Sequence, residues 1–534
     1  MNDLKETLRN LMKKIFSKEP VSEVENHSPI LIHGTLQKNI QHLKDTFGKS
    51  EDLILRKIKI GKQKNIEVVI IYIDGLAKTE SISNFIMESI MLDFTALELE
   101  NEASSTNDLL NFIKESILTA SEVKDITDFA TIGSSILSGD TVILIDGYNR
   151  GFSISTAGWQ ERGVEEPTSQ TVVRGPKEGF TENFRTNTTL VRRKIKSSNL
   201  WIETKQVGKV TQTNVGIMYI NGIANEKVVD EVRSRIDRIQ IDAILESGYI
   251  EELIQDKTFT PFPTVYNSER PDVIAAGLLE GRVAIVVDGT PFVLLVPGLF
   301  TQYFQSAEDY YHRSDFGLIR FLRYIALFLA LLGPSFYIAI TTFHQEMLPT
   351  QLLMSIAAQR EGVPFPAFVE AVMMEIAFEI LREAGVRMPR AVGQAVSIVG
   401  ALVIGQAAVE AGIVSAAMVI VVSITAIANF SFPAFNMAIS IRILRFAFMF
   451  LAASFGLFGI TVGLLIILLQ LCNLKSFGIP YLTPMAPFFL KDQKDTIIRF
   501  PHWSLFSRPR LVSQKNMTRE QTPPPTKSAP RRRK

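Results

Sequence analysis

The sequence predicts a multi-pass α-helical membrane domain that is preceded by a cytoplasmic α/β domain of two related subdomains. Two observations lead to this fold class. The N-terminal half of the chain repeats a pattern of short motifs, and the C-terminal half contains long runs without charged residues. At 534 residues the chain is also too long for a single hydrophobic core, so we expect several folding units.

The repeat consists of two pairs of motifs. YIDGLA at 72–77 returns as YINGIA at 219–224, and LSGDTVILIDG at 137–147 returns as LEGRVAIVVDG at 279–289. Each motif joins a β-branched run to an Asp-Gly or Asn-Gly pair, which is typical of a strand and the turn after it. Because both pairs occur in the same order, we infer that one α/β unit was duplicated. The Asp-Gly pairs are interpreted as turns that need a positive φ, with a metal or phosphate site as the alternative.

The membrane domain is predicted from the distribution of charge. Residues 391–441 contain one charged residue, Glu410, whereas 324–343 and 446–474 contain none. Runs of about 20 apolar residues are long enough to cross a bilayer. The expected spans are 318–342, 391–410, 413–430 and 446–471, and the total becomes six if the weaker candidates 286–300 and 364–381 also cross.

The two ends of the chain are expected in the cytoplasm. The N-terminus is amphipathic and lacks the apolar core of a secretory signal. The stretch from 507 is rich in proline, lysine and arginine, so we expect a disordered basic tail close to anionic membrane lipid. The predicted organisation is a polar leader (1–50), a first α/β subdomain (51–170), a charged linker (171–200), a second α/β subdomain (201–300), a membrane domain with four to six spans (301–474) and a cytoplasmic segment with the basic tail (475–534).

Several function classes find no support in the sequence. It contains no complete phosphate-binding loop, dinucleotide-binding motif, zinc-protease motif or nucleophile elbow. One cysteine, Cys472, allows neither a disulfide within the chain nor a cysteine-based metal site. A net charge of +1 gives no reason to expect a nucleic-acid partner. We therefore predict a protein that is not an enzyme and that uses no cofactor or metal.

Glutamates in an otherwise apolar helix are the candidate ion pathway. Three of them, Glu375, Glu379 and Glu383, recur every fourth residue and form one stripe, and Glu370 precedes them near the proline-rich start of the helix. A carboxylate in hydrocarbon costs roughly 2.5–3.5 kcal/mol, so such residues usually face water, a partner or an ion path. An interfacial helix whose acids face solvent is the alternative. The candidate ion-pathway residues are Glu370, Glu375 and Glu379.

Small residues at every fourth position predict close helix packing in the next apolar run. The stripe is formed by Gly393, Ser397, Ala401 and Gly405. Farther along, Gly459 and Gly463 repeat the device. Polar residues and a proline at 429–436 are interpreted as a loop between spans, with a broken helix beside a polar cavity as the alternative.

Three segments resemble a known family. RGPKEGFTENFRTNTTLVRRKI (174–195), ERPDVIAAGLLEGRVAIVVDGTPFVLLVPGLF (269–300) and VGQAVSIVGALVIGQAAVEAG (392–412) are similar to signature segments of the A subunit of GerA-type spore germination nutrient receptors. The resemblance runs from about 51 to 490, with departures at Lys177, where arginine is expected, and at Ser268, where threonine is more common. The signature residues are Arg174, Gly175, Pro176, Glu269, Arg270, Pro271, Asp272, Glu280, Gly281, Asp288, Gly289 and Pro291.

This resemblance implies a receptor subunit in the inner membrane of the bacterial spore. Its partners would be a permease-like B subunit and a C lipoprotein, and self-association into a ring would form a germinant-gated cation channel. The glutamates would then attract cations, and the basic residues of 171–200 would form a contact between subdomains or protomers. Two alternatives stay open, namely a family paralogue that amplifies germination without sensing nutrients and a secondary transporter-like subunit that binds the ligand itself.

Overall fold

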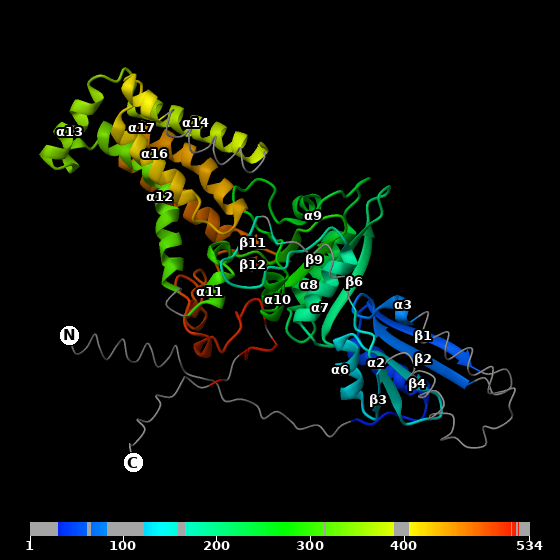
Figure 1. Cartoon of the computed structure of the whole chain (residues 1–534). Coiled ribbons are helices and arrows are strands. Elements are labelled where there is room, and N and C mark those ends of the chain that lie inside the picture. The colour runs from blue at the N-terminus through cyan, green and yellow to red at the C-terminus, as the bar shows by residue number, and fades with distance from the viewer. Residues whose placement is uncertain are drawn as a thin grey trace, which may run out of the picture. The chain divides into compact units, whose positions relative to one another are not determined.

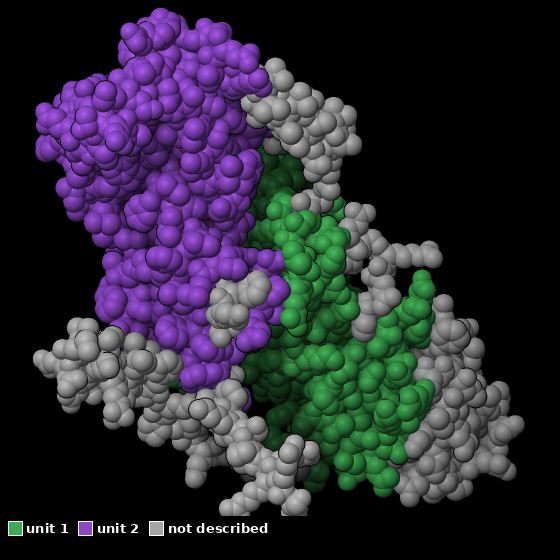
Figure 2. Space-filling model, turned by 60° about the vertical axis from the view of Figure 1, so that its left-hand side comes forward, with its two compact units in different colours: residues 1–255, 265–297, 506–521 green, residues 256–264, 298–505, 522–534 purple. Residues whose placement is uncertain are grey.

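The computed structural model describes residues 30–60, 66–82, 122–158, 166–167, 169–313, 317–388, 405–513, 515–519 and 522. The chain divides into two compact units, which Figure 2 colours separately. We call the first, Met1–Gln255 with Val265–Pro297 and Phe506–Gln521, the α/β unit. The second, Asp256–Thr264 with Gly298–Leu505 and Thr522–Lys534, is the helical unit.

The α/β unit consists of two halves with closely similar series of elements; among the described residues, α9 has no counterpart in the first half (Figure 1). The first half contains α2 (Leu36–Phe47), β1 (Leu53–Ile60), β2 (Ile66–Ile73), α3 (Thr79–Ser81), β3 (Val123–Ile126), α6 (Phe129–Ser138), β4 (Thr141–Ile145) and β5 (Gly151–Ile154). The second half contains α7 (Phe184–Lys194), β6 (Leu200–Val207), β7 (Thr213–Ile220), α8 (Glu226–Asp237), α9 (Ser247–Ile254), β8 (Tyr266–Ser268), α10 (Pro271–Leu279), β9 (Val283–Val287) and β10 (Val293–Val296).

Both halves arrange their strands in the same way. The first sheet has the order β1-β2-β4-β5-β3 and the second has the order β6-β7-β9-β10-β8, so each strand has a counterpart at the same place. Neighbouring strands are antiparallel throughout both sheets. The central strands β4 and β9 are buried along their whole length, which explains why they are continuous β-branched runs in the sequence. The predicted α/β domain of two related subdomains is confirmed.

The repeated glycine motifs are turns. Gly75 and Gly147 of the first half have φ angles of 89° and 87°, and Gly222 and Gly289 of the second half have 80° and 88°. A positive φ is the conformation that glycine adopts without steric cost. The interpretation of the Asp-Gly pairs as turns is confirmed.

The aspartates of the second motif pair have an additional role, because each one caps the first helix of its half. Oδ1 of Asp146 accepts from the backbone N–H of Leu36 at 2.9 Å, and Oδ1 of Asp288 accepts from that of Phe184 at 3.1 Å. These helices, α2 and α7, lie in the stretches that the sequence assigns to a leader and a linker.

A buried asparagine fastens each of these helices to the chain before it. Asn39 accepts from the N–H of His33 at 2.9 Å and donates to its carbonyl at 2.6 Å, and Asn187 makes the same two bonds with Thr181 at 2.8 and 2.6 Å. The two halves therefore share buried side-chain details as well as topology.

One weak membrane-span candidate belongs to the second sheet. Residues 286–300 contain the end of β9 and all of β10, whose residues are buried. The strand pairing with β8 and β9 supplies partners for their backbone groups. A crossing at 286–300 was wrong, because its apolar residues reflect a strand that is buried on both faces.

The helical unit contains the apolar runs. Its elements are η2 (Phe300–Phe304), α11 (Glu308–Tyr311), α12 (Gly317–Thr342), η4 (Gln345–Met347), α13 (Thr350–Arg360), α14 (Ala367–Arg387), α16 (Ala416–Asn429), α17 (Phe435–Asn473), β11 (Lys475–Ser476), β12 (Ile479–Pro480), η5 (Leu490–Lys494) and η6 (His502–Ser504). Among the described residues, α12 and α17 are long and apolar enough to cross a membrane. The chain between α16 and α17 is a short turn at 430–434, so the loop interpretation of 429–436 holds for Pro433, whereas Asn429 ends α16 and Asn436 lies in the first turn of α17.

α17 is not one continuous helix. Gly456 has φ 61° and ψ −141°, which is not helical. A Cβ placed at Gly463 would lie 2.8 Å from the ring of Phe448, and one at Gly459 would clash with the carbonyl oxygen of Leu451. In a straight helix Phe448 and Gly463 would be roughly 20 Å apart. The single span at 446–471 therefore needs correction, since the chain folds back at Gly456 and the two small residues permit close packing of the arms.

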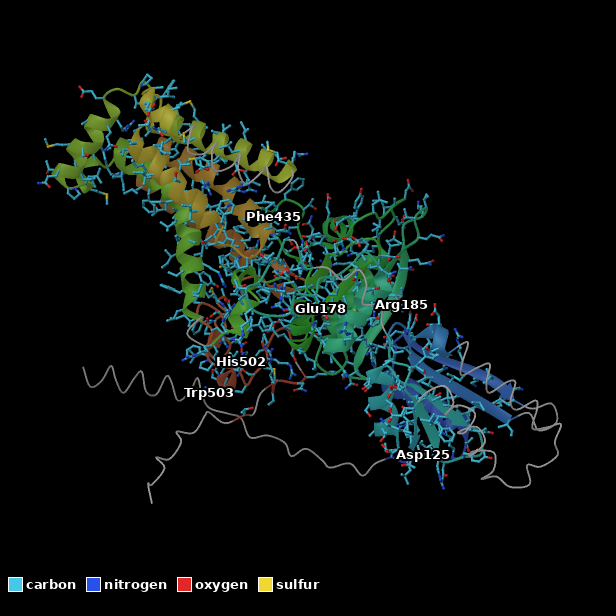
Figure 3. The ribbon with its side chains drawn as sticks, in the orientation of Figure 1. Asp125, Glu178, Arg185, Phe435, His502 and Trp503 are labelled. Carbon is cyan, nitrogen blue, oxygen red and sulfur yellow. The ribbon has the colours of Figure 1, made fainter. Side chains whose placement is uncertain are left out.

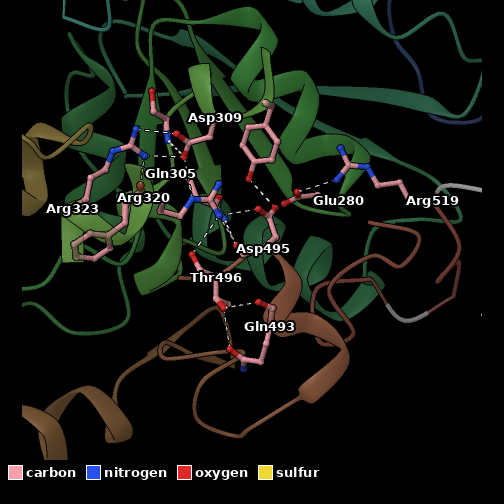
Figure 4. A network of polar contacts seen from close by, with 12 residues as sticks. Glu280, Gln305, Asp309, Arg320, Arg323, Gln493, Asp495, Thr496 and Arg519 are labelled. Carbon is pink, nitrogen blue, oxygen red and sulfur yellow. Dashed lines mark hydrogen bonds and ion pairs between the residues drawn. The ribbon is translucent and has the colours of Figure 1, made fainter. Parts of the chain in front are cut away.

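A buried ionic network fixes the first turn of α12 (Figure 4). Arg320 is 0% exposed and donates to Asp309 at 3.0 Å and to Asp495 at 2.8 Å. Arg323 donates to both carboxylate oxygens of Asp309, at 2.8 and 2.9 Å. The network ties the start of this apolar helix to segments before it and far after it in the chain.

Candidate functional site

The candidate ion-pathway residues all lie on α14, which packs against α12, α16 and α17. The helix begins directly after Pro366, and proline is compatible with a helix start because it has no N–H to leave unpaired. The predicted helix that carries the glutamates is confirmed, with the bounds Ala367–Arg387. The structure places an arginine beside each of its glutamates.

Glu370 is 0% exposed and is held mainly by hydrogen bonds. Its Oε2 accepts from the backbone N–H and from the hydroxyl of Ser415, each at 2.9 Å. Its Oε1 lies 3.4 Å from Nε of Arg360. Because Ser415 caps the N-terminus of α16, Glu370 joins the first turns of α14 and α16.

Glu375 is 2% exposed and forms an ion pair with Arg445 of α17 at 2.5 Å. The same arginine donates from Nε to the carbonyl of Ala330 in α12 at 2.7 Å. One guanidinium therefore joins three helices. Bringing two charges into an apolar environment is costly unless they pair closely, and this pair does.

Glu379 lies one turn farther along and is partly exposed. It accepts from Arg442 of α17 at 2.6 Å and from Arg382 at 3.2 Å. Glu383, which completes the stripe, pairs with Arg387 at the exposed end of the helix. The order of the partners shows that α14 runs antiparallel to the first arm of α17, since the later glutamate meets the earlier arginine.

The charged cluster formed by Glu375, Glu379, Arg442 and Arg445 is incompletely hydrogen-bonded. Buried atoms of three of these residues, Oε1 of Glu375, Nη2 of Arg445 and Nε of Arg442, have no hydrogen-bond partner among the described atoms. Each buried unsatisfied group costs about 1–3 kcal/mol. The four charged side chains therefore lower the stability of the helical unit, and packing of the helices alone does not explain their presence.

Sequence reasoning missed the two arginines of this cluster. Arg442 and Arg445 are the only charged residues between 411 and 474, and that isolation is the signal that identifies them. An arginine in an apolar helix suggests a functional or ion-paired side chain, as a glutamate does.

Of the four residues in the small-residue stripe, the structure describes Gly405. Gly393, Ser397 and Ala401 lie outside the described residues. A Cβ placed at Gly405 would lie 3.5 Å from the side chain of Val419, which is an ordinary contact.

The family-signature residues meet in the second half of the α/β unit. The guanidinium of Arg270 donates to the carbonyl of Pro176 at 2.9 Å and to the carboxylate of Asp272 at 2.8 Å. The N–H of Gly289 donates to the carbonyl of Glu182 at 2.8 Å. The segments 174–195 and 269–300 are therefore neighbours, and their signature residues fasten α7 and the chain before it to the second sheet.

Two ion pairs connect the halves of the α/β unit. Arg192 of α7 is 1% exposed and binds both carboxylate oxygens of Asp52, at 2.8 and 2.9 Å. Arg185 (Figure 3) pairs with Asp74 at 3.0 Å in a more exposed position. The expectation of a basic contact surface in 171–200 is thus met between subdomains.

A polar pocket of about 390 Å³ lies beside the exposed pair. Residues of both halves line it, and they include two acids and three basic residues, namely Asp74, Glu80, Lys78, Arg185 and Arg193. Within the lining, Arg185 pairs with Asp74, and the hydroxyl of Thr189 donates to the carbonyl of Arg185. The described residues show no group of acidic, histidine or cysteine side chains that would hold a metal ion.

Comparisons with known proteins agree with one another. Residues 41–511 match the family described as Bacillus/Clostridium GerA spore germination protein. The chain is 50% identical over 508 residues to spore germination protein KA of Bacillus subtilis (strain 168), which covers 94% of this chain and 92% of that protein. It is 46% identical over 497 residues to YfkQ of the same organism, named as an uncharacterized membrane protein, with coverages of 93% and 95%.

A solved structure also matches. The crystal structure of the N-terminal domain of the A subunit of the Bacillus megaterium spore germinant receptor GerK3 is 40% identical, covers 51% of this chain and 99% of that chain, and has a TM-score of 0.42.

The family match and the two relatives from Bacillus subtilis extend through both units of the chain. The family match spans the two sheets and continues beyond α17. The long apolar helices together with this match identify a membrane protein. The chain belongs to the GerA family of spore germination proteins, the family of germinant-receptor A subunits that its signature segments resemble.

Proposed function

We propose that this A subunit assembles with copies of itself into a germinant-gated cation channel in the inner membrane of the spore. Its α/β unit lies in the cytoplasm, and a permease-like B subunit and a C lipoprotein complete the receptor. Nutrient recognition belongs to the complex, and ion passage belongs to this chain. The family consists of receptor subunits and not of enzymes, in line with the lack of a catalytic motif.

The charged cluster on α14 and α17 carries this proposal. Glu375 and Glu379 are carboxylates in the apolar helical unit, and acidic side chains repeated around a ring attract cations. Glu370 is the weaker member, because its two bonds to Ser415 give it a sufficient structural role.

The arginines define the resting state in this proposal. Arg445 and Arg442 lie 2.5 and 2.6 Å from the two carboxylates, so a guanidinium stands where a permeating cation would bind. A cation competes poorly with a tethered charge at that distance, because the pair is held in a low-dielectric environment. The described arrangement corresponds to a closed pathway, and gating moves α17 relative to α14.

The test compares glutamate with arginine substitutions. Glu379→Gln removes a cation-attracting charge and is expected to slow potassium release from germinating spores. Arg442→Gln leaves Glu379 with only Arg382 and is expected to speed release or to start it without nutrient. Glu383→Gln, at an exposed pair on the same helix, is the matched control and should change neither.

A purely structural cluster makes the opposite prediction. Both substitutions would then lower the abundance of the complex on immunoblots and slow release together, because each removes the ion pair that joins α14 to α17 at Glu379 and Arg442. Changes of the same sign, or normal release with normal abundance in both variants, would contradict the pathway while leaving the family membership untouched.

A second candidate function stays beside the first, because the relative YfkQ is named only as a membrane protein and not as a germination protein. A paralogue that amplifies germination without sensing a nutrient would share the same fold. Deletion of the gene distinguishes the two roles. Loss of the response to one nutrient supports a receptor subunit, whereas a weaker response to every nutrient supports an amplifier.

A further inference from the structure

The segment after the last strand completes the first half of the α/β unit. It follows β5 directly and returns along the β2–α3 turn, where the N–H of Lys78 donates to the carbonyl of Thr156 at 2.9 Å and that of Gly158 donates to Leu76 at 3.1 Å. Ala157 lies between these bonds. A Cβ placed at Gly139 would lie 3.1 Å from the Cβ of Ala157 and 2.9 Å from the carbonyl oxygen of Leu76.

The second half has no such local segment. After β10 the chain passes into the helical unit at Gly298. The residue that corresponds to Ala157 by count from the last strand is Leu299, which belongs to that other unit. The second half therefore has to fill the equivalent position with a different part of the chain.

Ser513 fills this position. A Cβ placed at Gly281, the counterpart of Gly139, would lie 3.1 Å from the Cβ of Ser513 and 3.0 Å from the carbonyl oxygen of Ile223. Both glycines have a positive φ, 98° at Gly139 and 96° at Gly281. The two sites agree to within 0.1 Å in both distances, although Ser513 is more than 200 residues away from β10 in the chain.

Residues 506–519 are called the return segment, and the structure describes 506–513 and 515–519 of it. Val512 and Ser513 are 0% exposed. The ends of the segment pair through a bridge between Ser507 and Thr518. Arg508 donates to the carbonyls of Asn516 and Thr518, which closes the loop from inside.

Three basic side chains of the return segment bind the second half. Arg508 donates to the carbonyl of Leu279 at the end of α10 at 2.7 Å. Arg519 pairs with Glu280 at 3.3 Å, and Lys515 pairs with Glu226 at 2.5 Å. The hydrogen bond from Lys515 lowers the pKa of Glu226. Both ion pairs are exposed and contribute little to the binding of the return segment. The buried residues Val512 and Ser513, together with Arg508, therefore hold the segment on the second half.

We propose that the return segment is the missing last piece of the second half, docked from the far end of the chain. In the second half, the residues that follow β10 form the connection to the helical unit, and the return segment occupies the position that they would otherwise fill. Both ends of the helical unit are then fastened to one α/β half. The chain consequently crosses the membrane an even number of times, and a movement of the helices reaches the second half through two attachments.

The matched pair Ser513→Ala and Ser513→Phe tests the docking. Alanine is the residue found at the equivalent position of the first half, so Ser513→Ala should leave the segment in place. Phenylalanine cannot fit against Gly281 and should displace it. We expect trypsin to cut the full-length protein in membranes after Arg510 and Lys515 about tenfold faster in Ser513→Phe than in Ser513→Ala, as measured by mass spectrometry. Equal rates in the two variants would overturn the proposal.

Cysteine labelling provides a second test that does not depend on a bulky substitution. In a Cys472→Ser background, Lys515→Cys and Lys209→Cys place one thiol on the return segment and one on the exposed β6–β7 loop of the second half. A membrane-impermeant maleimide should label both from the same side of sealed vesicles. Labelling from opposite sides would overturn both the docking and the even number of crossings.

Discussion

The two halves of the α/β unit have the same fold but different charges where they meet. Asp52 of the first half corresponds to Asn199 of the second, and Arg192 of the second corresponds to Lys44 of the first. Asp52 and Arg192 form a buried pair, whereas Lys44 is exposed and is not paired with Asn199.

The second contact repeats this arrangement. Asp74 corresponds to Asn221, and Arg185 corresponds to Gln37, so the acid again belongs to the first half and the arginine to the second. The contact between the halves is therefore head-to-tail. Duplication produced two units with the same fold. Charge differences at a few equivalent positions make their contact asymmetric, with the acids on the first half and the arginines on the second.

The largest effect is expected at the buried pair. Arg192→Met leaves the carboxylate of Asp52 buried without its partner and should lower the free energy of unfolding by about 3–5 kcal/mol. Hydrogen exchange of the amides in α7 and β1 measures the loss. The double variant Arg192→Met, Asp52→Leu should recover most of it, and Lys44→Met at the equivalent exposed site should stay within about 0.5 kcal/mol. A large cost at Lys44 would contradict the asymmetry.

A smaller and nearly equal effect is expected at the two helix caps. Asp146→Ala and Asp288→Ala each remove the acceptor for the first N–H of α2 or α7, which should cost about 1 kcal/mol. The cost should be slightly higher for Asp288, because it is half-buried whereas Asp146 is exposed. Thermal unfolding of both variants measures it, and a difference of several kcal/mol would show that the halves are not equivalent in their shared features.

The smallest effect is a pH dependence caused by Glu251, a residue of the second half. Burial raises the pKa of Glu251 in α9 from 4.5 to about 7. Because the folded state holds this proton more tightly than the unfolded chain, the contribution of Glu251 to stability falls as the pH rises from about 4.5 to about 7. Glu251→Gln should therefore raise the free energy of unfolding at pH 8 by on the order of 0.5 kcal/mol, since the side chain is only partly buried, and leave it nearly unchanged at pH 4; the melting temperature at each pH measures the change.

The exposed neighbour Glu252 supplies the control for this prediction. Glu252→Gln should leave the melting temperature nearly unchanged at both pH values. A gain at pH 4 that equals the gain at pH 8 would exclude titration of Glu251 as the cause.

The duplication could be predicted because strands and their turns leave a strong local pattern. The β-branched runs before Asp74 and Asn221 and the glycines after them are required by the backbone. The helices α2 and α7 escaped notice, because their common feature is one buried asparagine each, Asn39 and Asn187, among otherwise different residues. A single shared polar residue is not a pattern that periodicity detects.

Long-range pairing explains what was missed in the helical unit. The glutamates of α14 stood out locally, but Arg445, the partner of Glu375, is 70 residues away. Gly456 lies within a run that contains no charge, so the run resembled one span, although its φ of 61° ends the helix. Composition likewise predicted a disordered tail from 507, and this was wrong for the described residues of the return segment. Two buried residues, Val512 and Ser513, anchor the segment, and a basic, proline-rich composition does not reveal them.

The central claim is that the far end of the chain completes the second half as Ala157 and its neighbours complete the first. Hydrogen exchange on two truncated proteins tests it most directly. A chain that ends at Leu505 should lose protection in α10 and the β7–α8 turn and keep it in the first half, whereas a chain that ends at Gln521 should match the full-length protein in both. Unchanged protection of α10 in the shorter chain would contradict the claim.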